Sequence, residues 1–302
     1  MNVKQLLYIL IFSLLIYSCK SSNEKGSNDE FQVPDSVANQ GVLEVSEQAM
    51  ENITENISSH IETAALIKNL NVPFSKDYLA PTDDVDQFST NFDQSLVLGI
   101  YGTDLGYLNM YNKTTVSLDY LRSIRKLANN IKVGQFFDFN TLQRLAKNNE
   151  NLDSLMYISQ RNFNQMDQYL RENNRSNLST LMIAGGWIEG LYLSGQVYRS
   201  APDPELREAI GEQKIILGDL MILLKNYRND RDFKRLIKEF NAIYELFKEV
   251  TITIEQGEPT QEVVDGRLVI QQNTKSIVNV SDKVLEQIID ESVRVRNEIL
   301  NE

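Results

Sequence analysis

Cysteine and histidine are almost absent from this chain. Its 302 residues include one cysteine, Cys19, and one histidine, His60. A single cysteine cannot close an internal disulfide or build a cysteine-rich metal site. A single histidine excludes zinc sites made of several imidazoles and leaves only His60 to serve in a Ser-His-Asp arrangement. His60 lies beside the apolar stripe of a predicted helix, so we do not expect it to be catalytic. We also expect no other catalytic residue, no metal and no cofactor.

Basic residues are scarce relative to acidic ones. The 30 Lys and Arg residues are outnumbered by 42 Asp and Glu residues, which gives a formal net charge of −12. Nucleic acids and anionic lipids attract positive surfaces, so this balance disfavours both as partners. The sequence also lacks the phosphate-binding, nucleophile-elbow and zinc-protease motifs. We therefore expect no nucleic-acid partner and no membrane binding through a basic patch.

A short acidic segment, Asp83-Asp84-Val85-Asp86, lies in a predicted loop. Carboxylate oxygens are ligands that calcium prefers. The glycine and the final glutamate of an EF-hand loop are missing at the positions where that loop requires them. We therefore expect a solvated loop rather than a metal site.

The N-terminus carries an apolar leader. Lys4 precedes an apolar run from Leu6 to Tyr17 that only Ser13 interrupts. A run of about 12 residues is shorter than the roughly 20 needed to span a bilayer and is typical of a signal peptide. We expect residues 1–18 to be removed as a signal peptide.

The end of this leader, Leu15-Ile16-Tyr17-Ser18-Cys19, resembles the lipobox of bacterial lipoproteins. The resemblance implies cleavage before Cys19 and acylation of Cys19 with fatty acids such as palmitate, so that lipid chains hold the protein on a membrane. A secretory leader with an incidental cysteine is the alternative. Polar residues over 19–40 predict a flexible tether, followed by a single helical domain over 41–302.

Apolar residues recur at helical spacing through most of the domain. A stripe formed by Ala49, Ile53, Ile57, Ile61 and Ala65 predicts the first helix. Short connections between successive helices favour antiparallel neighbours, so we expect an all-α, multi-helix bundle. The expected helices cover about 42–70, 88–111, 115–131, 138–148, 151–170, 178–199, 205–227, 232–249 and 281–302.

The helical pattern breaks between about residues 250 and 280. Residues 251–254 read TITI, which is a β-branched alternating pattern, and residues 262–270 read EVVDGRLVI. Apolar pairs on both sides of Asp265-Gly266 form a strong short-range hairpin signal. We expect a small β-hairpin inserted in the bundle, with or without a third strand.

Two apolar helical segments contain glycines and one acid each. Residues 98–108 read LGIYGTDLGYL, and residues 184–193 read AGGWIEGLYL. Glycine inside a helix costs about 1 kcal/mol relative to alanine, so its presence needs a reason. One reason is close helix packing through two pairs of glycines spaced four residues apart. The pairs are Gly102 with Gly106 and Gly186 with Gly190.

The other reason is a ligand pocket between about residues 96–111 and 180–198. Asp104 and Glu189 occupy matching positions in the two segments, and paired acids in an apolar cleft bind a cation or act as acid and base. We favour helix packing over a ligand site. The candidate ligand-binding residues are Asp104, Tyr107, Trp187, Glu189 and Tyr192, with Tyr101 beside them.

Several segments together are similar to a group of uncharacterised, mostly helical lipoproteins of Bacteroidetes-type bacteria. These segments are the lipobox at Cys19, the two glycine-bearing helices and the VVDGRLVI sequence at 263–270. The resemblance implies an envelope location and brings no catalytic residue.

The sequence thus favours a non-enzymatic envelope component, anchored by lipid at the outer membrane, that binds or scaffolds another envelope protein. A ligand-binding lipoprotein with the pocket described above is the alternative. An enzyme that uses carboxylates ranks third.

Overall fold

The computed structural model describes residues 67, 70, 72–147, 152–256, 260–264, 267–271 and 274–301. Several expectations from the sequence lie outside these residues. They are the signal peptide, lipidation of Cys19, the tether, the stripe of the first helix with His60, and the Asp265-Gly266 turn.

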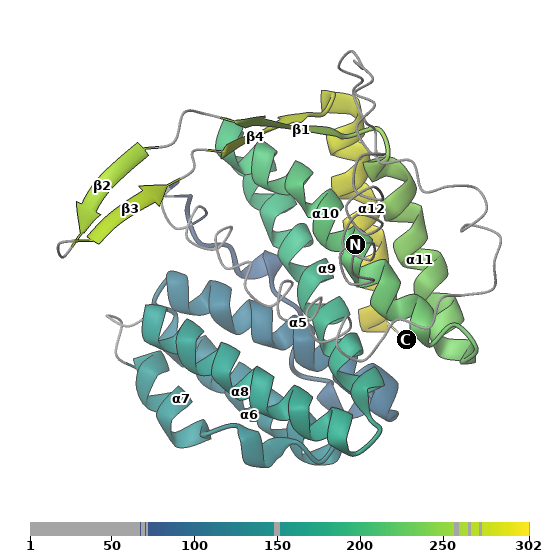
Figure 1. The fold of residues 1–302 in the computed structure, drawn as a ribbon. Helices are drawn as coiled ribbons and strands as arrows, with labels where there is room; N and C mark the ends of the chain where they lie inside the picture. The colour runs from purple at the N-terminus through teal and green to yellow at the C-terminus, as the bar shows by residue number, and fades with distance from the viewer. Residues whose placement is uncertain are drawn as a thin grey trace, which may run out of the picture. The chain divides into compact units, whose positions relative to one another are not determined.

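Eight α-helices make up most of the described structure, with a small antiparallel β-structure inserted before the last helix (Figure 1). This confirms the mainly all-α fold predicted from the sequence. The helices are α5 (Asn91–Met110), α6 (Thr114–Asn130), α7 (Phe139–Lys147), α8 (Leu152–Glu172), α9 (Ser176–Ser200), α10 (Pro204–Asn226), α11 (Arg231–Phe247) and α12 (Asp282–Asn301).

Polar capping residues explain where several helices begin. The side chains of Thr90, Asp203 and Asp230 accept hydrogen bonds from amides in the first turns of α5, α10 and α11. Pro204 occupies the first position of α10, where no amide donor is needed. Asp138 caps α7 in the same way. These local signals place the helix boundaries within a few residues of those expected from the sequence.

Helices α5 and α9 pack against each other along much of their length at the centre of the fold. Their backbones approach closely at two glycines. A methyl group on Gly99 would overlap the carbonyl oxygen of Met182, and a methyl group on Gly185 would overlap that of Leu96. These positions therefore require glycine because any side chain would separate the two helices.

The glycine pairs expected from the sequence are not the ones that make this contact. Gly102, Gly106 and Gly190 have open space where a methyl group would lie, and Gly186 has only ordinary contacts there. Of these four glycines, Gly186 does lie where the helices meet, because a methyl group on Gly99 would lie 2.7 Å from the Gly186 amide nitrogen. The Thr103 hydroxyl also donates to the Gly186 carbonyl oxygen at 3.2 Å.

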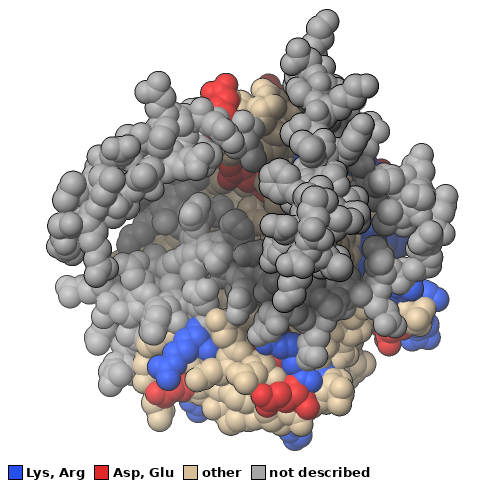
Figure 2. All heavy atoms as spheres, viewed as in Figure 1, with Lys and Arg blue, Asp and Glu red and all other residues tan. Residues whose placement is uncertain are grey.

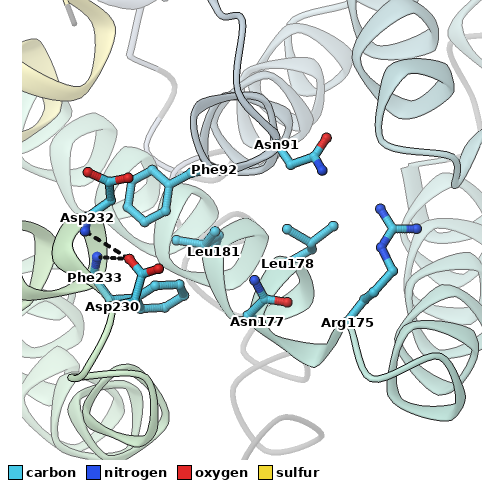
Figure 3. A pocket seen from close by; sticks show the side chains of 9 residues that line it. All are labelled: Asn91, Phe92, Arg175, Asn177, Leu178, Leu181, Asp230, Asp232 and Phe233. Carbon is cyan, nitrogen blue, oxygen red and sulfur yellow. Dashed lines mark hydrogen bonds between the residues drawn. The ribbon is translucent and has the colours of Figure 1, made fainter.

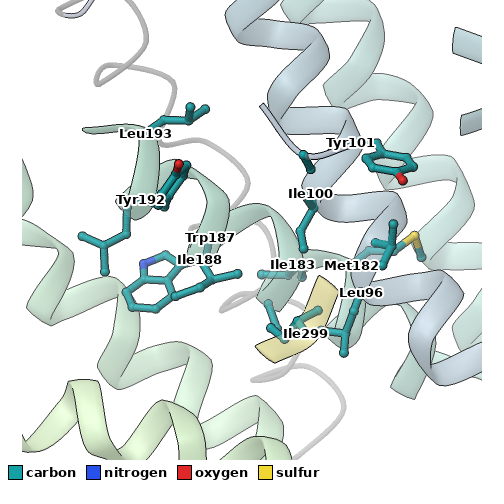
Figure 4. Packing of buried hydrophobic residues seen from close by; sticks show 14 of the residues in the cluster. Leu96, Ile100, Tyr101, Met182, Ile183, Trp187, Ile188, Tyr192, Leu193 and Ile299 are labelled. Atoms are coloured by element: carbon teal, nitrogen blue, oxygen red, sulfur yellow. The ribbon is translucent and has the colours of Figure 1, made fainter. Parts of the chain in front are cut away.

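The other helices lie on two sides of the α5–α9 pair (Figure 1). Helices α6, α7 and α8 form one group, and α10, α11 and α12 form the other. Apolar side chains from α5 and α9 meet Ile299 of α12 in one continuous layer (Figure 4). Burial of this apolar surface supplies the main stabilising term, at about 25 cal/mol for each Å² removed from water.

Four strands form two separate two-stranded ladders between α11 and α12. Strand β1 (Thr251–Gln256) pairs antiparallel with β4 (Thr274–Asn279). Strand β2 (Thr260–Val264) pairs antiparallel with β3 (Arg267–Gln271). The hairpin predicted around Asp-Gly is therefore present as β2 and β3. The predicted strand at 251–254 corresponds to β1, which pairs with β4. The sequence analysis did not identify this pairing because the two strands lie far apart along the chain.

The β1–β4 ladder rests on α10. A methyl group on Gly211 of α10 would overlap the side chain of Val278 in β4. Ser276 donates to Glu212, and the Lys214 ammonium donates to the carbonyl oxygen of Val250 at 2.5 Å. The β2–β3 ladder, in contrast, extends beyond the helices (Figure 1).

Candidate functional site

Asp104 of α5 and Glu189 of α9 lie next to each other in the protein interior. Each has 0% of its surface exposed. The two carboxyl groups lie close enough for each to affect the pKa of the other. The structure therefore brings together the two acids that occupy matching positions in the two glycine-bearing segments.

Arg296 of α12 completes this group. Its Nε donates to Glu189 Oε2 at 2.9 Å, and its Nη2 donates to Glu189 Oε1 at 3.1 Å. The guanidinium also lies over the ring of Tyr192, 4.4 Å from its centre. A two-point contact of this kind is among the stronger ion pairs in proteins. We call Asp104, Glu189 and Arg296 the buried cluster.

The sequence analysis missed Arg296. Its position on α12 was nevertheless informative, because Ile288, Ser292 and Arg296 follow one another at intervals of four residues. Ile288 and Ser292 are both fully buried, and this spacing carries Arg296 onto the same inward face. A charged residue on the buried face of a predicted helix indicates a buried partner of opposite charge.

The chain before α5 lies across the buried cluster. We call residues 75–81 the strap; it includes the short 3-10 helix η1 (Lys76–Tyr78). The amide of Ala80 donates to Asp104 Oδ2 at 3.0 Å. Arg296 Nη2 donates to the carbonyl oxygen of Tyr78 at 3.2 Å. Two members of the cluster thus hold backbone groups of the strap.

Tyrosines from α5 and α6 hold the strap at further points. The Tyr120 hydroxyl donates to the Ala80 carbonyl oxygen, and the Tyr101 hydroxyl donates to that of Pro81 at 2.7 Å. The amide of Ser75 donates to the Tyr107 hydroxyl at 3.3 Å. Polar side chains inside the bundle therefore satisfy most of the strap's inward backbone groups, as buried backbone groups require.

The charge balance of the cluster requires one proton. Burial raises the pKa of Asp104 well above its usual range, and the charge of Glu189 raises this pKa further. The Ala80 amide and the Arg296 charge lower it, but by less. Burial also raises the pKa of Glu189, although the charge and the hydrogen bonds of Arg296 partly offset this rise. Because Glu189 holds both guanidinium contacts, Glu189 is the ionised acid and Asp104 is the protonated one. The cluster is then electrically neutral.

The hydrogen-bond geometry of Asp104 agrees with this assignment. Its Oδ2 accepts from Ala80, whereas its buried Oδ1 receives no hydrogen bond from a donor. A bare carboxylate oxygen without a donor is costly in the interior, but a hydroxyl at that atom donates instead of accepting. Asp104 as a neutral acid donates to Glu189 and leaves no buried charge without a partner.

The surrounding tyrosines are neutral. Burial raises the pKa of Tyr101, Tyr107 and Tyr120 further above the ordinary alkaline value. The Asp104 charge would raise the pKa of Tyr101 and Tyr120 still more. These hydroxyls therefore act as hydrogen-bonding groups in the strap contacts, and they are poor candidates for a base.

Trp187 has contacts of its own with α10 and α11. Trp187 donates from Nε1 to Gln213 Oε1 of α10 at 3.0 Å, and its ring packs near Phe240 of α11. Tyr192 lies beneath Arg296, and Tyr107 contacts one end of the strap. The strap and Arg296 take up hydrogen-bonding positions on both acids, where the sequence analysis had placed a ligand.

A surface pocket of about 240 Å³ lies elsewhere, where α5, α9 and α11 begin (Figure 3). Arg175 donates from Nη2 to the Ile131 carbonyl oxygen, and Asp230 caps α11. These polar side chains already have structural partners, so the pocket shows no dedicated binding chemistry. Its lining residues are Asn91, Phe92, Arg175, Asn177, Leu178, Leu181, Asp230, Asp232 and Phe233.

In the described part of the chain, no helix has the length and apolar character needed to cross a membrane. The same residues contain no group of three His, Cys, Asp or Glu side chains placed to hold a metal ion. On the face drawn in Figure 2, the described Lys and Arg residues are interspersed with Asp and Glu residues.

Three comparisons bear on the identity of the chain. Neither protein-family models, nor curated proteins, nor solved structures gave a match to it.

Proposed function

We propose that the mature protein is a lipid-anchored component of the cell envelope, at the outer membrane, that binds another protein through the β2–β3 ladder. The lipobox-like leader and Cys19 support the anchor. The observation that carries the binding function is the two-stranded ladder, whose outer strand edges have no neighbour among the described residues.

Open strand edges are binding elements. Among the described residues, each strand of the β2–β3 ladder pairs with one other strand, which leaves the backbone N–H and C=O groups along its other side without a strand partner. An extended segment of a partner can add to such an edge as a further strand. Five residue pairs in the ladder provide a preformed template for this addition.

The β1–β4 ladder differs in its surroundings. It is fastened to α10 through Val278, Ser276 and the contact of Lys214 with Val250. It therefore serves as the base from which β2 and β3 extend. A lipid anchor at one end of the chain and a strand template on the folded domain together suit a protein that recruits a partner to a membrane surface.

Site-specific photo-crosslinking in intact cells tests this proposal. A photoreactive amino acid replaces Gln261 in β2 or Gln271 in β3, and a matched control carries it at Arg122, an exposed position on α6. We expect one adduct of defined mass from both ladder positions and none from the control. Absence of an adduct at both ladder positions, or the same adduct at Arg122, contradicts binding through the ladder.

The anchor has its own test. Cells fed an alkyne-bearing palmitate label lipoproteins at the acylated cysteine. We expect the wild-type chain to take up the label and the Cys19→Ala variant to lack it and keep its signal peptide. Labelling that persists in Cys19→Ala contradicts the anchor without affecting the test of the ladder.

A ligand held between α5 and α9 remains the alternative from the sequence. No observation in the described residues favours it, because Asp104 and Glu189 already contact each other, the strap and Arg296.

A further inference from the structure

We propose that the buried cluster is a proton-dependent latch. It holds the strap, residues 75–81, against the helices while Asp104 carries a proton, and it releases the strap when that proton is lost. The inference concerns how the domain is connected to the chain that precedes it, and it does not depend on what β2 and β3 bind.

The first step is the composition of the cluster. Asp104 and Glu189 are fully buried, and Arg296 is 6% exposed. Two carboxyl groups and one guanidinium are neutral only when one carboxyl group is protonated. If both were ionised, a negative charge would remain inside the bundle without a counter-ion, which is strongly unfavourable in a site without water.

The second step is the identity of the other groups near Asp104. Among the described residues, the other titratable groups around the cluster are mainly tyrosines, which supply no positive charge to compensate a second carboxylate. They are Tyr101 on α5, Tyr120 on α6, Tyr192 on α9 and Tyr78 in the strap. Asp83 and Asp84, just after the strap, lie near Tyr101 and likewise supply no positive charge.

The third step is which element gives way. Helices α5, α9 and α12 are regular helices, whereas the strap has one turn of 3-10 helix and no strand pairing. The strap places Leu79 and Ala80 in the apolar core, and its Lys76 and Asp77 are exposed. Opening the strap admits water to Asp104 and keeps the hydrogen-bonded helices. An irregular segment with few backbone hydrogen bonds of its own opens before regular helices do.

The Ala80 amide favours ionisation of Asp104 and so opposes opening of the strap. Its hydrogen bond to Asp104 Oδ2 becomes stronger when Asp104 is ionised, because the acceptor is then charged. One amide donor does not replace the full hydration of a carboxylate, and the repulsion from Glu189 remains. The balance therefore favours opening once the proton is lost.

The direction with pH follows from linkage. The closed state holds a proton on Asp104 that the open state releases near the ordinary pKa of an aspartic acid. Closure is therefore fully favourable at low pH and weakens as pH rises through the raised pKa of Asp104 in the closed state.

Amide hydrogen exchange of the full-length mature chain tests the latch. We measure the protection factors of Ala80 and Ser75 between about pH 5 and pH 9, so that the intrinsic pH dependence of exchange cancels. We expect protection of both amides to fall by up to about tenfold for each pH unit between the ordinary pKa of an aspartic acid and the raised pKa of Asp104 in the closed state. Amides in the core of α9 should keep their protection.

Two variants separate a latch from simple packing. Asp104→Asn keeps an acceptor for Ala80 and a donor for Glu189 but cannot ionise, so protection should become independent of pH. Tyr120→Phe removes the hydroxyl that binds the Ala80 carbonyl oxygen, so protection should fall at every pH with an unchanged pH dependence. A flat wild-type profile, or the same decline in Asp104→Asn, overturns the proposal.

A measurement on the wild-type chain tests the latch even if the variants do not fold. The carboxyl ¹³C shift of Asp104 reports its protonation in the wild-type chain. We expect Asp104 to stay a neutral acid at pH values at which an ordinary aspartic acid is already ionised. An Asp104 that ionises in the closed state at the ordinary pKa of an aspartic acid overturns the latch, whatever the behaviour of the variants.

Discussion

The buried cluster and the β2–β3 ladder represent opposite uses of polar groups. In the cluster, Arg296 pairs with Glu189, and Asp104 accepts a hydrogen bond from the strap. All three side chains are buried. In the ladder, the outer backbone groups of both strands have no strand partner among the described residues. A closed polar network fixes internal geometry, whereas open backbone groups can recruit another chain. We therefore propose that the cluster controls stability and conformation and that the ladder binds a partner.

The largest expected effect comes from breaking the ion pair in the cluster. Glu189→Leu leaves Arg296 buried without its two-point partner, and we expect a loss of about 3–5 kcal/mol in the free energy of unfolding. Urea denaturation followed by circular dichroism measures this loss. The double variant Glu189→Leu with Arg296→Leu serves as the control and should recover most of the stability, because no lone charge remains buried. If Glu189→Leu alone is as stable as the wild type, the Glu189–Arg296 ion pair does not stabilise the fold.

The second effect is the pH dependence of global stability. Asp104 has a raised pKa in the folded protein, so the folded state binds more protons than the unfolded state above the ordinary aspartate pKa. Its contribution is complete at low pH and decreases as pH rises, by up to about 1.4 kcal/mol for each pH unit. The difference between wild type and Asp104→Asn, measured by denaturation at several pH values, isolates this contribution from other titrating groups. A difference that does not change with pH would show that Asp104 is not protonated in the folded protein.

The third effect concerns the contact that brings the two acids together. Gly185→Ala places a methyl group against the Leu96 carbonyl oxygen, and we expect a loss of about 1–3 kcal/mol as the helices separate. Gly190→Ala on the same helix has open space for its methyl group and should be neutral or stabilising by up to about 1 kcal/mol. Thermal unfolding of both variants makes the comparison. Equal effects at the two positions would contradict the close approach at Gly185.

The smallest effect on stability, and the sharpest contrast with the cluster, is expected in the ladder. Val263→Pro removes a backbone donor from β2, yet it should change the free energy of unfolding of the helices by less than about 0.5 kcal/mol. The same variant should lose the crosslinked adduct expected at Gln261. Denaturation and crosslinking on one preparation give both values. Loss of stability without loss of the adduct would reverse the roles that the comparison assigns.

The sequence predicted the helical fold well because its signals are local. Apolar residues at helical spacing, together with caps such as Asp203 and Asp230, define both the faces and the starts of helices. The Asp265-Gly266 signal correctly indicated the β2–β3 pair around it. The pairing of β1 with β4 was missed because the sequence contains no short-range signal for partners so far apart.

The sequence identified only part of the candidate site. It singled out Asp104 and Glu189 because an acid in a glycine-bearing apolar helix is unusual, but it gave Arg296 and the strap no role. It also placed Trp187 with the acids, whereas the tryptophan contacts Gln213 on α10. The spacing within one helix does not show which face meets which neighbour.

The sequence by itself therefore determined the types of elements, most of their boundaries, the excess of negative charge, and the leader with Cys19 that predicts an anchor. Only the tertiary structure decided that Gly99 and Gly185 form the close contact and that the Arg296 guanidinium pairs with Glu189 beside Asp104. It also decided that residues 75–81 cover those acids. The physical reason is range: helix formation depends on neighbours a few residues away, whereas charge compensation in the interior depends on residues brought together from across the chain.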